Sequence, residues 1–309
     1  MIEANATKLA QTLKARDQNI ADSFSYIASV FDVEVPNYQG PVASAILADV
    51  VSHISAGNGE AAKQAFIEID TVTQELQDNS TVGWQSSVLP QSIWKKMHRL
   101  FDTDAEISFN PRPPTSEQVD LFTSRAAEVR DILARFSPAA LAEFDQIVKI
   151  TLLGGPEDET PLSSFDGCST FFCPGAILIN VAEKRTLVRT LEVLLHEASH
   201  VLLYAIVGSD GLSANDPEAL FASPLRPDPR PMEGIFHAAF VTARVHWVIS
   251  YALSQAGFPE ELRDEFETEK DRLEMASRTS LEVMLESCIP TPPGEKVFSD
   301  LKRYWSIAV

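Results

Sequence analysis

Two apolar stretches of helix length constrain this chain of 309 residues more than any other feature of its sequence. They cover about residues 187–207 and 235–254, and each is interrupted by histidine and by a charged residue. A helix that crosses a bilayer needs about 20 apolar residues with few or no charges. We therefore expect two buried helices in the core of a globular protein, and no contact with a membrane.

The charge balance narrows the partners that such a protein can have. The chain carries 25 Lys and Arg against 44 Asp and Glu, a net charge of −19, and no basic stripe interrupts this acidic character. An acidic surface repels a phosphate backbone, so we expect no nucleic-acid partner, whereas a basic peptide would be attracted. Three cysteines are too few and too odd in number for a disulfide framework, and the N-terminus shows no targeting signal. These features indicate a cytoplasmic protein.

The remaining periodicity predicts a mainly α protein with a small β element ahead of the first apolar helix. Two short apolar runs, 147–153 and 176–180, are flanked by Gly or Pro and predict the strands. A proline-rich break at 110–114 separates a helical N-terminal part, 1–110, from the rest, 111–309. Apolar residues recur at helical spacing over five further segments, namely 5–31, 42–56, 59–77, 116–136 and 138–148.

Local signals set several helix ends. Thr115 and Gln118 form the pattern of a capping box, which predicts a helix start. Gly208 is expected to end a helix over 183–207. Thr279 with Glu282 predicts the start of another helix near the C-terminus.

The first apolar stretch contains the sequence His196-Glu197-Ala198-Ser199-His200. Residues four apart lie on one face of a helix, so the two imidazoles can bind one metal ion. Histidine side chains in an otherwise apolar helix need a polar reason to be there, and a metal ion supplies one. The motif therefore predicts a metal site with His196 and His200 as ligands.

A third ligand has to come from outside this helix, because its next turns offer only Tyr204. The second apolar stretch supplies Glu233 and His237, which are again four residues apart. We favour His237 as the third ligand, with Glu233 as the alternative.

Two enzyme classes fit these residues. In a zinc hydrolase, Glu197 would be the general base that takes a proton from water on the metal. In a non-heme iron oxygenase, a 2-oxo acid needs a cation for its distal carboxylate, ideally arginine. Arginines that meet this need surround the second apolar stretch: Arg226, Arg230 and Arg244. Arg244 has an equally plain structural explanation, which is a salt bridge to a buried acid.

The same segments carry a family resemblance. Residues 195–200, followed after a loop by 225–237 with the sequence LRPDPRPMEGIFH, resemble the HExxH-type peptide-modification family. Its pattern pairs an H-E-x-x-H helix with a later helix start of the type D-P-R-P-x-x-G-x-x-H, and a short strand such as 175–180 precedes the first helix. The resemblance covers about residues 170–250, and nothing in 1–110 contributes to it.

The resemblance implies an Fe(II)- and 2-oxoglutarate-dependent β-hydroxylase that acts on a peptide or an amino-acid-derived substrate. It makes His196, His200 and His237 the iron ligands and Arg230 a candidate anchor of the cofactor, with 111–309 as the catalytic part. Glu197 would then orient a ligand or a substrate amide, since this chemistry needs no base to split water. A zinc peptidase remains the alternative, and a metal-free peptide-binding module is a third.

Overall fold

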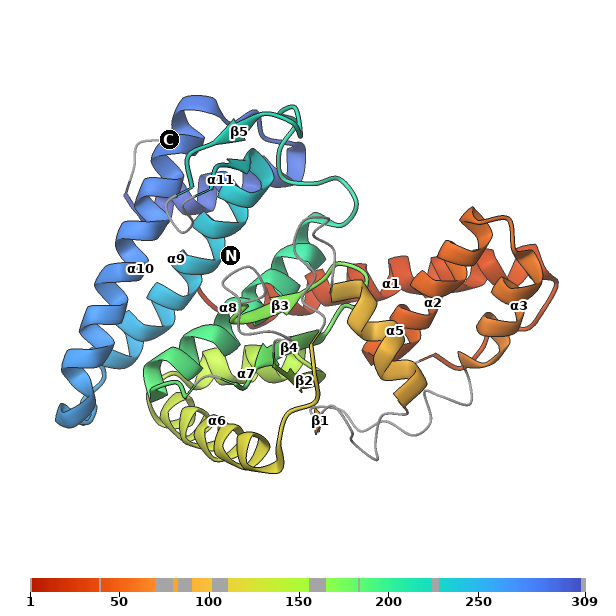
Figure 1. Ribbon diagram of the computed structural model, residues 1–309. Helices are drawn as coiled ribbons and strands as arrows, with labels where there is room; N and C mark the ends of the chain where they lie inside the picture. Colours follow the sequence, from red (N-terminus) through yellow and green to blue (C-terminus); the bar gives the residue numbers. More distant parts are fainter. Residues whose placement is uncertain are drawn as a thin grey trace. The chain divides into compact units, whose positions relative to one another are not determined.

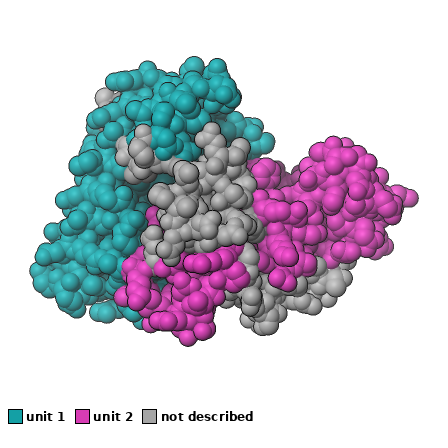
Figure 2. Space-filling view, in the orientation of Figure 1, with its two compact units in different colours: residues 1–12, 126–144, 186–309 teal, residues 13–125, 145–185 magenta. Residues whose placement is uncertain are grey.

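The computed structural model describes residues 2–38, 40–69, 80–82, 91–101, 111–155, 165–182, 184–223 and 228–306. Over these ranges the protein is mainly α with a few short strands, which confirms the predicted fold class (Figure 1). Contacts group the chain into two compact units, coloured separately in Figure 2. Unit 1 comprises residues 1–12, 126–144 and 186–309, and unit 2 comprises 13–125 and 145–185.

These units divide the chain differently from the sequence boundary at residue 110. Helix α1 (Ala6–Phe31) and helix α6 (Ser116–Phe136) each contribute residues to both units. The predicted linker lies partly outside the described residues, and the division into 1–110 and 111–309 stays a prediction.

Unit 2 contains a four-stranded sheet in the order β1-β2-β4-β3. Parallel pairing joins β1 (Ser80–Val82) to β2 (Ile150–Gly154) and β2 to β4 (Ala176–Asn180), and β3 (Gly167–Ser169) runs antiparallel to β4. All five residues of β4 are buried. An uninterrupted apolar run is typical of a strand in a sheet that is covered on both faces. For this reason the strand at 176–180 could be predicted from the sequence.

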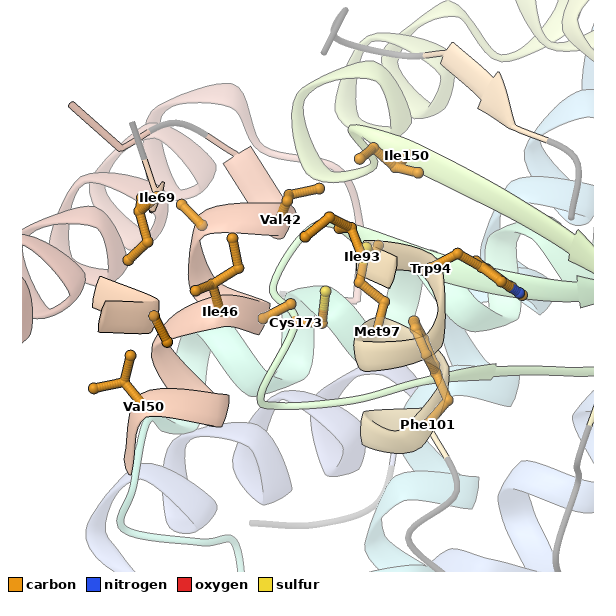
Figure 3. Close-up of a cluster of buried hydrophobic side chains, with 14 of the residues drawn as sticks. Val42, Ile46, Val50, Ile69, Ile93, Trp94, Met97, Phe101, Ile150 and Cys173 are labelled. Atoms are coloured by element: carbon orange, nitrogen blue, oxygen red, sulfur yellow. The ribbon is translucent and has the colours of Figure 1, made fainter. Parts of the chain in front are cut away.

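Three helices and part of α1 surround an apolar cluster in unit 2 (Figure 3). Helix α2 (Gly40–Ser55) contributes Val42, Ile46 and Val50, and helix α5 (Gln91–Phe101) contributes Trp94 and Met97. Helix α3 (Gly59–Ile67) packs on α2. Cys173 belongs to this cluster and Cys168 packs against it, and both are free thiols, which in such a position act as small apolar side chains.

Unit 1 is built around the two apolar helices. Helix α8 (Leu187–Val207) packs against α9 (Met232–Ser254), and α9 lies along α10 (Glu260–Ser287), as Figure 1 shows. Helix α11 (Pro292–Tyr304) contacts both α8 and α9. Most of α7 (Pro138–Ile147) and a short ribbon of β5 (Leu220–Phe221) and β6 (Arg230–Pro231) complete the unit.

Most predicted helix ends agree with the structure, and one is wrong. Thr115 and Gln118 exchange the two capping-box hydrogen bonds, and Gly208 ends α8 with a φ of 62°. The pair Thr279 and Glu282 starts no helix, because α10 runs through both residues. Its apolar face continues across them and packs on α9, which overrides the local capping pattern.

Among the described residues, α8 is the one helix long and apolar enough to cross a membrane by length and composition. Of its most apolar window, 72% is buried inside the protein. A largely apolar helix is equally suited to the core of a folded unit, and most residues of α8 are buried in unit 1.

Candidate metal centre

Helix α8 presents one line of polar side chains inside an apolar unit. The Thr186 hydroxyl caps its first turn by accepting the Arg189 N–H. Residues four apart then place Glu192, His196, His200 and Tyr204 above one another on a single face. The surrounding leucines and valines are buried, whereas the three ring side chains of this line are only partly buried and keep some access to solvent.

Helix α9 brings the third histidine to this line. It begins directly after Pro231, and its first two turns carry Glu233 and His237. The His237 ring lies beside those of His200 and Tyr204, with centroids 5.0 and 5.3 Å away. The structure therefore gathers the three histidines singled out in the sequence into one cluster.

Within the cluster His200 lies between the other two histidines. Its Nε2 is 3.2 Å from Nε2 of His196, and its Nδ1 is 2.9 Å from Nδ1 of His237. Each contact joins two ring nitrogens, so at most one member of each pair can carry the proton.

The environment keeps the rings of His200 and His237 uncharged at neutral pH. Burial, together with the neighbouring His196 and His237, holds the pKa of His200 well below its usual 6.5. Burial and the nearby His196 lower the pKa of His237 to about 4. Metal ions bind the neutral imidazole, so the cluster offers lone pairs at neutral pH.

Two of the three histidines already have their ring nitrogens at a separation that suits binding to one ion. Ligand nitrogens about 2.0–2.1 Å from one ion, at angles of about 90–110°, lie about 2.9–3.4 Å apart. The 3.2 Å separation of the His196 and His200 Nε2 atoms falls in that range. His237 meets the other nitrogen of His200, so it reaches the same ion only after a side-chain rotation of His200 or His237. Accordingly, no three metal-binding side chains in the described ranges already form a finished site.

A carboxylate that sequence reasoning missed lies next to His196. Glu192 Oε1 is 3.8 Å from His196 Nδ1, on the side of the ring away from His200. Glu192 is also ion-paired with Arg189 at 3.1 Å and with Arg272 of α10 at 3.3 Å. Its place four residues before His196 was the available signal, because that spacing puts it on the same helix face.

Glu233, the alternative third ligand, has a structural role. Its carboxylate accepts the backbone N–H groups of Leu212 and Ser213 at 3.0–3.1 Å. The same loop packs closely on α11, because a Cβ added at Gly294 would collide with the carbonyl of Leu212. Both Glu233 oxygens are therefore engaged in holding the loop after α8, and His237 is the freer of the two candidates.

The predicted catalytic residue Glu197 is buried, at 4% exposure, next to His196 on α8. A carboxylate at this depth needs polar partners or a nearby cation. Its burial on the helix that carries His196 and His200 is compatible with either role considered for it.

The three candidate arginines differ sharply. Arg244 forms a buried ion pair with Glu143 and donates a hydrogen bond to the Ile2 carbonyl at 3.0 Å. This ion pair is the salt bridge to a buried acid that the sequence analysis gave as the alternative role of Arg244. Arg230 pairs with the half-exposed Asp228 at 2.8 Å, and Arg226 lies outside the described residues.

Comparison with known proteins supplies no relative for this site. No protein-family model matches the chain, and no curated protein gives a significant match.

Proposed function

We propose that the chain is an Fe(II)- and 2-oxoglutarate-dependent oxygenase that hydroxylates a peptide or an amino-acid-derived substrate. The observation that carries the proposal is the cluster of three histidines from α8 and α9, in which burial lowers the pKa of His200 and His237. It joins the two sequence segments on which the resemblance to the HExxH-type peptide-modification family rests.

In this proposal His196, His200 and His237 hold the metal. Iron and 2-oxoglutarate would supply the oxidising power from O₂, which side chains lack. The apolar side chains of α8 and α9 around the cluster are buried, and the histidines themselves keep partial access to solvent, through which a substrate could approach. Arg230, whose partner Asp228 is solvent-accessible, is the better candidate for the distal carboxylate of the cofactor, because Arg244 is already paired in the core.

The charge of the chain supports a peptide substrate with basic residues. A net charge of −19 attracts cationic segments over distances of about one Debye length, roughly 8 Å at physiological salt.

A zinc metallopeptidase is the second candidate, and the burial of Glu197 on the same helix as the two histidines favours it. There Glu197 would take the proton of the attacking water. The two proposals separate in one assay. Protein purified without oxygen is given Fe²⁺ and 2-oxoglutarate, and succinate is measured, while a parallel sample with Zn²⁺ is tested for peptide cleavage. Succinate formation supports the oxygenase, and cleavage without succinate supports the peptidase.

A further inference from the structure

We propose that Glu192 and Glu233 are positioning residues that hold the outer ring nitrogens of His196 and His237. The two imidazoles would then bind the ion through different atoms, His196 through Nε2 and His237 through Nδ1. This inference rests on the proposed metal centre and adds to it two carboxylates and a choice of ring nitrogen.

The two carboxylates occupy equivalent places on two different helices. Each lies four residues before a histidine, Glu192 before His196 on α8 and Glu233 before His237 on α9. Glu192 Oε1 is 3.8 Å from His196 Nδ1, and Glu233 Oε1 is 4.0 Å from His237 Nε2. In both pairs the opposite ring nitrogen is the one that faces His200.

This arrangement selects a tautomer for each outer histidine. A neutral imidazole has one N–H and one lone pair, and a carboxylate can only accept. With the N–H directed at the carboxylate, the lone pair of each outer histidine points toward His200. Rotation of the His200 side chain would then bring one ion within reach of both lone pairs. Distances of 3.8 and 4.0 Å exceed a hydrogen bond, so a small side-chain rotation or one bridging water completes each contact.

Both carboxylates are held in place by other groups. Arg189 and Arg272 fix Glu192 from α8 and α10. The backbone N–H groups of Leu212 and Ser213 fix Glu233. Partners that are themselves anchored lose little freedom when the metal binds, which is how an outer carboxylate raises metal affinity.

The test is the affinity of the full chain for Zn²⁺, a diamagnetic probe, measured by competition with a chromophoric chelator. We expect Glu192→Ala and Glu233→Ala each to weaken Zn²⁺ binding about 10- to 100-fold, with partial recovery in the Gln variants. Two controls disturb the same surroundings without removing a contact to histidine. Glu269→Ala removes the ion pairs of Glu269 with Arg189 and Arg272. Thr291→Val removes the hydrogen bond that Thr291 donates to the Gly211 carbonyl in the loop. Both controls should keep wild-type affinity.

A second readout identifies the bound atoms directly. In the Zn²⁺-loaded, ¹⁵N-labelled chain, imidazole shifts should show metal on Nε2 of His196 and on Nδ1 of His237. The Gln variants keep a carbonyl acceptor for the loop, so the comparison survives if Glu233→Ala fails to fold. Wild-type affinity in both glutamate variants, or metal on Nε2 of His237, overturns the inference and leaves the metal centre standing. A wild-type chain that binds no Zn²⁺ or Fe²⁺ overturns both.

Discussion

The Nε2 atoms of His196 and His200 lie 3.2 Å apart, at the separation expected for two ligands of one ion. We therefore expect His196→Ala and His200→Ala each to abolish metal binding. The helix should persist, because its buried leucines and valines still pack when either ring is removed. Metal content by plasma mass spectrometry and helicity by circular dichroism check this pair. Full metal occupancy in either variant would contradict the site.

Substitution of His237 and substitution of Glu233 should have different effects on metal affinity. His237→Ala removes a proposed ligand, so metal affinity should fall by well over the loss seen in Glu233→Gln. The glutamate variant loses charge but keeps an oxygen for the N–H groups of Leu212 and Ser213. Chelator competition gives both affinities, and the reverse order would assign the third position to Glu233.

Replacement of Arg244 and of Arg230 should have different consequences. Arg244→Ala leaves Glu143 charged and buried without its partner, at a cost of about 3–5 kcal/mol in unfolding free energy. Arg230→Ala should leave stability nearly unchanged and raise the 2-oxoglutarate requirement about ten- to a hundredfold.

Urea unfolding and succinate formation against 2-oxoglutarate concentration distinguish these arginine effects. Glu143→Gln with Arg244→Met serves as the matched double variant, which should recover part of the stability. An unchanged cofactor requirement in Arg230→Ala excludes Arg230 as the anchor.

Acid should destabilise the metal-free protein through its histidines. The native state keeps His237 neutral down to about pH 4, whereas the unfolded chain takes up the proton near pH 6.5. Between these values the unfolded state binds more protons, so stability falls as the pH falls, by up to about 1.4 kcal/mol per pH unit for each such histidine. Above pH 6.5 this contribution is constant.

Unfolding midpoints from pH 7.5 to 4.5 measure that slope. The pKa of His246 is also lowered to about 4 by burial, so it contributes equally to wild type and to His237→Gln. The His237→Gln variant should therefore lose stability more gently than wild type. Parallel curves would show that His237 is not held neutral.

Sequence periodicity predicted the helices of the candidate metal centre because α8 and α9 are long and apolar. The pairs His196–His200 and Glu233–His237 were visible for the same reason, since four-residue spacing fixes a shared helix face. That α9 brings His237 to His200 depends on tertiary packing, which no local pattern encodes. The same is true of Arg244 and Glu143, which are far apart in sequence and meet only in the folded unit.

Local sequence patterns did not predict several other features of the structure. Strands β1 and β3 are three residues long, too short for an alternation to appear. Glu192 was overlooked because acids in helices are usually solvated, and its spacing of four residues from His196 gains meaning only with its burial between Arg189 and Arg272. The Thr279–Glu282 pattern predicted a helix start that does not exist, because packing on α9 stabilises α10 as one continuous helix through both residues.

The central claim is that this cluster supports oxidation by iron and 2-oxoglutarate. Glu197→Gln keeps the size of the side chain and a hydrogen-bonding end but cannot accept a proton. General-base catalysis contributes about 10²–10⁴ in rate, so a peptidase would lose nearly all cleavage in this variant. Succinate release with Fe²⁺, 2-oxoglutarate and a basic peptide is the decisive measurement, for wild type and Glu197→Gln. We predict succinate from both proteins. No succinate from wild type, together with Zn²⁺-dependent peptide cleavage that Glu197→Gln abolishes, would contradict the account.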